Sequence, residues 1–219
     1  SGFASFSALS EDLEIVFGLF AEVLQQPIFA REKLDLAKTQ VRGGIARRND
    51  NPNGIVGREF QKLVYGNDSP YARTVEYATL DNISRQDLVD FYRQYFHPNN
   101  IILGIVGDFD AQKMRSLIQK YFGSWKSQPI SQPQLPTASQ SKLSGLFFVD
   151  RPQLTQSYVQ VGHLGGQFNS PDYPALDVMN QVLNGFGGRL FNSVRSRQGL
   201  AYSVYGVWSP RFDYPGLFV

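Results

Sequence analysis

Two side chains in the later part of the sequence, Arg195 and Tyr202, could together stabilise a negatively charged oxygen atom. Arginine presents a fork of N–H donors, and tyrosine presents a single O–H donor. When such donors are directed at one carbonyl oxygen, they stabilise the negative charge that develops on it. Both residues lie in the stretch 184–205, which also contains the glycine cluster Gly185-Phe-Gly-Gly188 and two further arginines. This stretch is therefore the first candidate for function.

The pattern around Arg195 predicts a helix followed by a strand. The residues spaced as one apolar helix face are Leu190, Phe191 and Val194. Arg195 follows Phe191 by four positions and so lies near the edge of that face. Gly199 is expected to end the helix, and the β-rich sequence after it places Tyr202 at the start of a strand. Because the turn between them is short, the two polar tips are expected to converge.

The glycine cluster suggests a phosphate cradle as an alternative, but its surroundings do not fit one. The segment before it is predicted to be a helix rather than a strand. The sequence here has neither a Gly-Lys-Ser/Thr motif nor a G-x-G-x-x-G motif within a βαβ unit. Nucleotide binding is therefore disfavoured.

The run Gly-Gly-Arg-Leu-Phe-x-x-Val-Arg-x-x-x-Gly-Leu-Ala-Tyr-Ser-Val at 187–204 resembles the non-zinc half of insulinase-like (pitrilysin) zinc peptidases, including mitochondrial processing peptidases. The resemblance extends to 71–110, with Ser-Pro-Tyr-Ala-Arg73 and Ile-Val-Gly-Asp-Phe-Asp110. It implies that Arg195 and Tyr202 hydrogen-bond a substrate near its scissile carbonyl. Without the resemblance, a helix-edge arginine is more often a solvated charge and a strand tyrosine more often packs.

Composition excludes several other classes of protein. The chain has 219 residues, 42% of them hydrophobic, and a net charge of +2, which gives no general case for binding nucleic acid or an anionic membrane. Its longest apolar runs are strand-sized, so no membrane span is expected. The absence of cysteine excludes disulfides and thiolate zinc sites but suits the cytosol and a bacterial periplasm or cell envelope equally.

The remaining pattern predicts an α+β fold made of two insulinase-type α/β sandwich domains, with antiparallel-rich sheets packed against helices. The predicted helices are 10–26 with Ser10 as N-cap, 31–48, 52–65, one opened by the capping box Ser84-Arg-Gln-Asp87, 111–122 and 171–183. The predicted strands are 1–9, a fully buried strand at 100–107, 145–149, 157–161 and 214–219.

The stretch 127–144, rich in Gln, Pro and Ser, predicts a linker between the two domains. Residues 1–126 are then the C-terminal part of a first domain and 145–219 the N-terminal part of a second. The sequence at each end of the chain is typical of a strand that has been cut. We therefore expect both domains to be truncated and the chain to be part of a longer protein.

The chain does not match the zinc ligands of the family that it resembles. Such peptidases bind zinc through a His-x-x-Glu-His helix and a downstream glutamate, with the first glutamate as general base. The two histidines, His97 and His163, are 66 residues apart, and we interpret both as structural residues. The resemblance places the downstream ligand at Gly44, and no Glu occurs between Glu32 and Glu59. We therefore predict no metal ligand and no catalytic residue in this chain, with zinc held by a partner chain or by a motif upstream.

These observations lead to a functional hypothesis with two alternatives. The hypothesis is a non-catalytic, substrate-binding subunit in which Arg195 and Tyr202 contact a peptide or unfolded polypeptide in the active site of a catalytic zinc-peptidase subunit of the same family. The first alternative is an active zinc metalloendopeptidase whose metal motif lies upstream. The second is a structural, core-like subunit that serves assembly.

Overall fold

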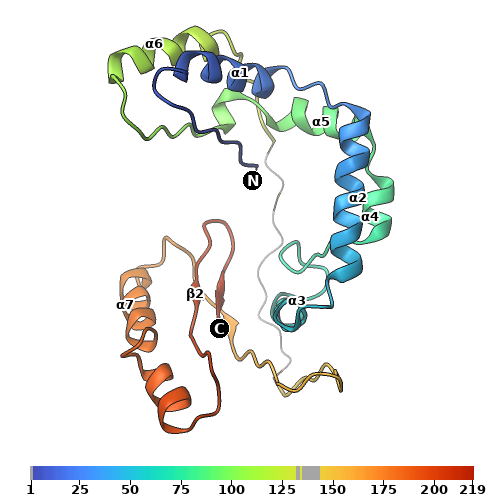
Figure 1. Ribbon diagram of the computed structural model, residues 1–219, viewed down its shortest axis with the longest axis vertical. Helices are drawn as coiled ribbons and strands as arrows, with labels where there is room; N and C mark the ends of the chain where they lie inside the picture. The colour runs from blue at the N-terminus through green and yellow to red at the C-terminus, as the bar shows by residue number, and fades with distance from the viewer. Residues whose placement is uncertain (1, 132–133, 135–143) are drawn as a thin grey trace. The chain divides into compact units, whose positions relative to one another are not determined.

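The structure is a computed structural model that describes residues 2–131, 134 and 144–219 (Figure 1). It combines helices with a small antiparallel sheet, which confirms the predicted α+β class. The chain groups into two compact units, Ser1–Gly43 with Glu76–Pro133 and Gly44–Val75 with Gln134–Val219. The predicted boundaries at 126 and 145 remain a prediction, because most of the linker proposed at 127–144 lies outside the described residues.

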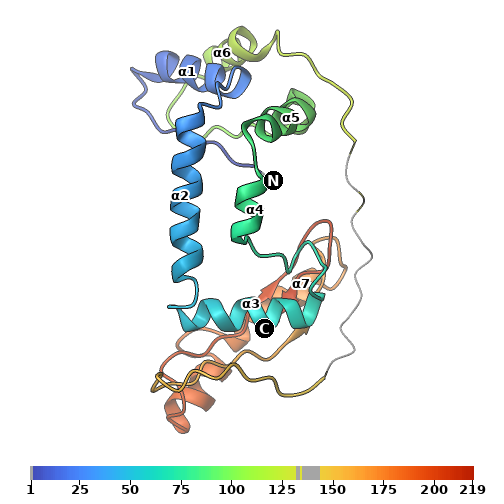
Figure 2. The same ribbon diagram turned by 90° about the vertical axis from the view of Figure 1, so that its right-hand side faces the viewer.

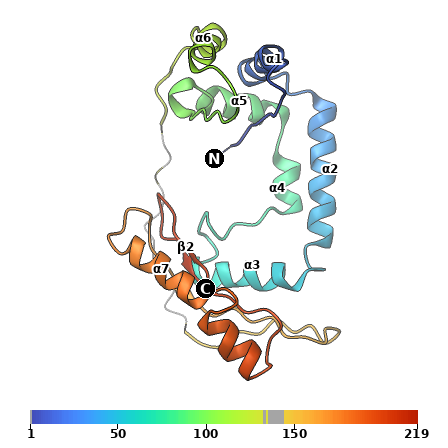
Figure 3. The ribbon, with the colours of Figure 1, turned by 60° about the vertical axis from the view of Figure 1, so that its left-hand side comes forward.

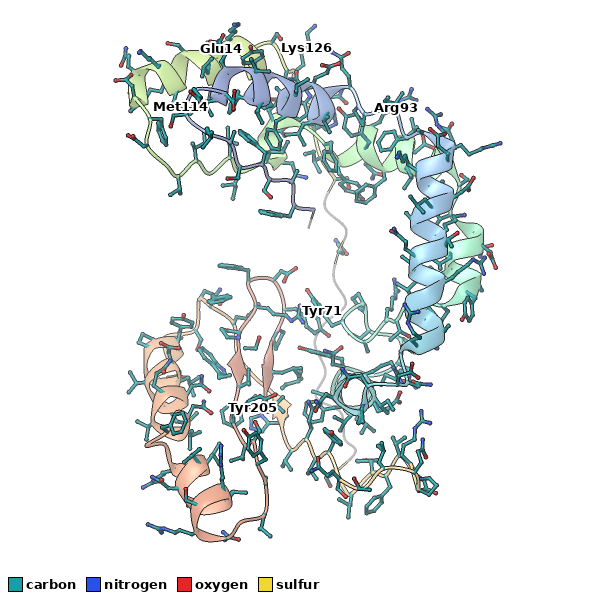
Figure 4. All side chains as sticks on the ribbon, in the orientation of Figure 1. Glu14, Tyr71, Arg93, Met114, Lys126 and Tyr205 are labelled. Carbon is teal, nitrogen blue, oxygen red and sulfur yellow. The ribbon has the colours of Figure 1, made fainter. Side chains whose placement is uncertain are left out.

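The helices that begin in the first unit are α1 (Leu13–Gln25), α2 (Arg31–Arg47), α4 (Tyr77–Asn82), α5 (Arg85–Tyr95) and α6 (Ala111–Phe122), with a 3-10 turn η1 at Pro98–Asn100. α1 packs on α6 around Phe17, whose side chain is 1% exposed and whose ring meets Phe122 edge-on at 5.6 Å. In Figure 4 the labelled side chains of Glu14 and Met114 mark these two helices. Buried aromatic contacts of this kind stabilise the packing of α1 on α6.

Side-chain contacts attach the shorter helices of the first unit to the longer ones. Arg42 of α2 pairs with Asp81 of α4 and lies 5.8 Å above the ring of Tyr77, so the two helices lie against each other (Figure 2). The hydroxyl of Tyr92 on α5 donates to the carbonyls of Leu24 and Gln25 at 2.9 and 2.8 Å. The end of α1 is therefore fixed to α5.

The start of α5 follows its local sequence signal, whereas the start of α1 does not. The Ser84–Asp87 capping box is present as predicted, since the Ser84 side chain accepts from Asp87 N–H while the Asp87 carboxylate accepts from Ser84 N–H. Ser10, however, is not the N-cap of α1, which corrects that prediction. The helix begins at Leu13 after Asp12, and Ser10 Oγ instead donates to the Asp108 carbonyl at 3.0 Å.

The second unit contains the helices α3 (Pro52–Tyr65) and α7 (Tyr173–Leu183), the π-helix η2 (Phe191–Arg197) and the sheet. Its strands are β1 (His163–Leu164), β2 (Trp208–Ser209) and β3 (Leu217–Phe218), with β3 in the middle and antiparallel to both neighbours. α7 lies beside β2 (Figure 3).

The core of the second unit is a cluster of tyrosine rings. Tyr71 stacks on Tyr214 with centroids 4.5 Å apart, and Arg211 lies 4.5 Å above the ring of Tyr71. Tyr65, at the end of α3, packs on both rings, and its hydroxyl donates to the Pro215 carbonyl at 3.1 Å. Burial raises the pKa of the Tyr65 phenol, which fits its place in this core. The cluster joins α3 and the loop after it to the β2–β3 hairpin.

Most of the predicted strands are not formed in the described residues. Of the buried strand predicted at 100–107, residue 100 ends the turn η1 and residues 101–106 belong to no helix or strand, and Ile102 is 100% exposed. Residues 2–9, 145–149, 157–161 and the segment around Tyr202 are likewise not assigned to strands, whereas the end of the chain does form β3. The physical reason is that a strand exists only through hydrogen bonds to a neighbouring strand, which alternation of side chains cannot supply.

Candidate functional site

The loop that precedes the candidate site depends on its glycines. Gly185 has φ +82°, which glycine adopts without strain. A Cβ added to Gly188 would lie 2.2 Å from the carbonyl oxygen of Asn184, so no larger residue fits there without moving the backbone. This tight loop therefore directs the chain from the end of α7 into the next helix at Arg189.

That helix becomes the π-helix η2, which carries Arg195. The predicted helix is confirmed, although the π geometry was not foreseen. Gly199, with φ +63°, ends it as predicted, and the amide of Gly199 donates to the carbonyl of Arg195 at 3.1 Å. Single turns of π-helix occur frequently at functional sites because they reorient side chains relative to a regular helix.

The structure brings Arg195 and Tyr202 together. The guanidinium carbon of Arg195 lies 4.5 Å from the centroid of the Tyr202 ring and 4.9 Å from that of Phe191. Tyr202 is 82% exposed and lies in a bend after the helix, whereas the sequence predicted a strand there. The convergence expected from the short turn through Gly199 is present.

The hydrogen-bonding groups of this pair remain available. Within the part of the chain that the structure describes, no hydrogen bond or ion pair holds the Arg195 guanidinium or the Tyr202 hydroxyl. Arg189 and Arg197 lie on the same helical segment, and residues 184–205 contain no acidic residue. The surface is therefore cationic and rich in donors, which suits a carbonyl or carboxylate ligand.

Neither histidine belongs to a group of potential metal ligands among the described residues. The buried His97 directs Nε2 to the Arg93 carbonyl at 2.7 Å, and His163 on β1 directs Nδ1 to the Leu164 carbonyl at 2.6 Å. Among residues 2–131, 134 and 144–219, no three His, Cys, Asp or Glu side chains form a group that could hold a metal ion. The same residues offer no helix that could cross a membrane.

The predicted position of the third zinc ligand, Gly44, lies inside α2 and has no donor atom to offer. The nearest downstream glutamate, Glu59, is engaged on α3, where Lys62 and Arg58 each lie 3.1 Å from its Oε1. Burial raises the pKa of Glu59, but the hydrogen bonds and charges of Lys62 and Arg58 outweigh it and leave the pKa lowered. The residues that the structure describes therefore do not fit a zinc centre of their own.

A second feature, a groove of about 1040 Å³, is lined by α3 and by residues 144–164 of the same unit. Its walls are largely apolar, and Gln160 Oε1 is buried there without a partner among the described atoms. The groove does not include Arg195 or Tyr202. Sequence analysis missed it, because residues 145–149 and 157–161 were interpreted as strands.

Comparison with known proteins agrees with the resemblance seen in the sequence. The model of the peptidase M16 inactive domain matches residues 82–218. An uncharacterized zinc protease of Mycobacterium leprae is 29% identical over 205 residues, 91% of this chain and 45% of that protein. The uncharacterized zinc protease YmxG of Bacillus subtilis is 26% identical over 94% of this chain and 49% of its own length.

Solved structures support the same assignment. The peptidase M16 inactive domain from Pseudomonas fluorescens superposes with a TM-score of 0.80 at 25% identity, covering 95% of this chain and 50% of that one. A protease from Helicobacter pylori gives a TM-score of 0.75 at 22% identity over 95% of this chain and 51% of its own, which shows the shared fold.

The chain spans about half the length of the curated relatives that it matches. The model match covers more than half of the chain and includes the whole segment that carries Arg195 and Tyr202. The chain therefore belongs to the peptidase M16 inactive-domain family of insulinase-like proteins.

Proposed function

We propose that this chain is the peptide-binding, non-catalytic part of a zinc peptidase, and that Arg195 and Tyr202 contact the substrate. The observation that carries the proposal is the position of the Arg195 guanidinium over the rings of Tyr202 and Phe191, 4.5 and 4.9 Å from their centroids. Contact with aromatic rings does not consume the N–H groups of a guanidinium, so they stay free to donate. The Tyr202 hydroxyl, on an 82% exposed side chain, is free as well.

These two donors suit the chemistry of peptide-bond hydrolysis. When water adds to a peptide carbonyl, negative charge moves onto its oxygen, and a fixed donor there stabilises the transition state more than the ground state. Such a donor contributes on the order of 3 kcal/mol. Arg195 and Tyr202 then bind and orient the carbonyl, while the zinc ion and general base come from a catalytic chain or segment of the same family.

The partner follows from what this chain lacks. The relatives bear the name zinc protease, whereas the residues described here do not fit a zinc centre. A two-part arrangement reconciles these observations: one part holds the metal, and this part holds the peptide. The ligand is an extended or unfolded polypeptide, because its carbonyl groups are not held in the hydrogen bonds of a helix or sheet and can accept from side chains.

The test is binding and cleavage of a fluorescently labelled unstructured peptide. We expect the Arg195→Ala/Tyr202→Phe double variant to bind the peptide more weakly, and to lower cleavage by the reconstituted pair with a catalytic M16 chain, each on the order of 10-fold or more. Arg115→Ala, which removes an exposed charge from α6 outside the candidate site, is the matched control and should change both little. Cleavage at the unmutated rate by the double variant would refute the proposal, and chelator-sensitive cleavage by this chain alone would favour an active peptidase.

A further inference from the structure

Two asparagines near the end of α7 hold the segment that returns after Tyr202. The side-chain amide of Asn184 donates to the Gly206 carbonyl at 2.7 Å, and its Oδ1 accepts from the Gly206 amide at 2.8 Å. Asn180, one turn earlier, accepts from the Trp208 amide at 3.3 Å and from Asn184 Nδ2 at 3.2 Å. The side chain of Asn184 thus pairs with Gly206 as a neighbouring strand would.

This pairing joins the two ends of the segment 184–206. Asn184 and Gly206 are 22 positions apart, and the residues between them include the glycine loop, η2, Arg195 and Tyr202. Figure 4 labels Tyr205, which lies between the exposed Tyr202 and the held Gly206. The amide of Val207 also donates to the Val219 carbonyl at 2.6 Å, which attaches the same segment to the end of the chain.

The two asparagines differ in what their amide groups do. Asn184 uses both ends of its amide, since Nδ2 donates to Gly206 O and to Asn180 O at 2.7 Å while Oδ1 accepts from Gly206 N. Asn180 uses only its oxygen in the contacts to Asn184 and Trp208. Replacing NH₂ by a carboxylate oxygen should therefore disrupt the contacts of Asn184, by placing a carboxylate against two carbonyls, but leave those of Asn180 in place.

We propose that Asn184 is a positioning residue that sets Tyr202 against Arg195, with Asn180 supporting it through the Trp208 amide. Asn184 begins the loop that leads to Arg195, and its side chain also holds the residues that follow Tyr202. It therefore fixes both ends of the segment 184–206. The guanidinium of Arg195 and the hydroxyl of Tyr202 are consequently held at a fixed distance from each other before a peptide binds. Such preorganisation lowers the ordering cost of binding. The functional consequence rests on the proposed function above.

The test compares Asn184→Ala, Asn184→Asp and Asn180→Asp in the purified chain by NMR. The readout is the ring-current shift of the Arg195 side-chain protons, which depends on the Tyr202 ring and which a purely structural loss of stability would not move. Tyr202→Leu supplies the shift expected when that ring is absent. We expect Asn180→Asp to keep the shift of the unmutated chain, and both Asn184 variants to move it toward the Tyr202→Leu value.

Asn184→Ala is included because it leaves Gly206 unpaired without adding a charge, so that it should fold even if Asn184→Asp does not. A folded Asn184→Ala that keeps the shift of the unmutated chain would overturn the inference. So would an Asn180→Asp that loses the shift as fully as Asn184→Asp.

Peptide affinity, measured on the same proteins, tests the functional step separately. We expect Asn184→Ala to weaken binding of the unstructured peptide on the order of 10-fold, since small displacements of binding groups are costly. If the NMR shift is lost while affinity is unchanged, the positioning role stands and the proposed function is wrong.

Discussion

The guanidinium of Arg195 lies over the ring of Tyr202, with 4.5 Å between the guanidinium carbon and the ring centroid. The two residues are seven positions apart and are brought together by the reversal at Gly199. A cation over an aromatic face contributes roughly 0.5–1 kcal/mol at an exposed site, so this contact orients the pair more than it stabilises the fold. This distinction decides which substitutions should affect binding and which should affect folding.

Arg195→Lys should separate the effect of the positive charge on peptide binding from the effect of the planar guanidinium. Lysine keeps the positive charge but lacks the planar fork that stacks on Tyr202 and Phe191 while donating in its plane. We expect peptide affinity to fall on the order of 10-fold, with the free energy of unfolding within about 1 kcal/mol of the unmutated value. Fluorescence anisotropy and urea unfolding provide the two measurements. A variant that unfolds would show that Arg195 is structural, and one that binds as tightly as the unmutated chain would show that the positive charge suffices without the planar fork.

Tyr202→Phe should isolate the hydroxyl group. The phenyl ring keeps the contact with Arg195, so the ring-current shift of Arg195 should persist, while the donor near the peptide carbonyl is lost. We expect unchanged stability and slower cleavage by the reconstituted pair, on the order of 10-fold. Tyr205→Phe, which alters a neighbouring exposed tyrosine, is the control. Equal cleavage by Tyr202→Phe and the unmutated chain would restrict Tyr202 to orienting Arg195.

Sequence reasoning located the helices because their signals are local. Pro52 after Asn51, and Ser84 three residues before Asp87, each describe a complete helix start, and α3 and α5 begin there. Strands were overpredicted because residues such as Ile102 carry the right composition without a paired neighbour. The short helix α4 was missed because six residues are too few to show a period.

The candidate site shows the same division between local and distant contacts. The meeting of Arg195 and Tyr202 was predictable, since only one glycine-ended turn separates them. The π geometry of η2 was not, because no simple pattern encodes its hydrogen bonds. The pairing of Asn184 with Gly206 could not be predicted either, because it joins positions 22 apart that carry no complementary sequence signal.

The capping box of α5 gives a pH prediction. The Ser84 side chain and backbone N–H hydrogen-bond the Asp87 carboxylate and lower its pKa from 3.8. Because the folded pKa is lowered, the stabilisation is present above the unfolded pKa and is lost as pH falls through the folded one. NMR titration of the carboxyl carbon should show the lowered pKa, and Ser84→Ala should raise it again. Ser116→Ala on α6 should leave it unchanged, and a Ser84→Ala chain with the same Asp87 pKa would contradict the assignment.

Gly44 allows a prediction about stability. It lies within α2, and a Cβ added there meets no atom within 4 Å. Gly44→Ala should therefore stabilise the chain by about 0.5–1 kcal/mol, because alanine restricts the unfolded chain and favours the helix. Gly188→Ala is the contrasting variant, since its Cβ would lie 2.2 Å from the Asn184 carbonyl oxygen. Urea unfolding should shift in opposite directions for the two changes, and a destabilising Gly44→Ala would mean that this position is constrained in a way the structure does not show.

The last prediction concerns zinc. A catalytic zinc site needs three protein ligands, and no three His, Cys, Asp or Glu side chains lie together among the described residues. In addition, position 44 is glycine, and Glu59 pairs with Lys62 and Arg58. We expect the chain Ser1–Val219, incubated with zinc and freed of excess, to retain no stoichiometric metal by elemental analysis, while a catalytic M16 chain treated alike retains one equivalent. One zinc ion per chain would contradict this. His163→Ala and Glu59→Gln would then locate it, because both residues line the groove beside α3, and loss of the metal in either variant would place a zinc site there and favour an active peptidase.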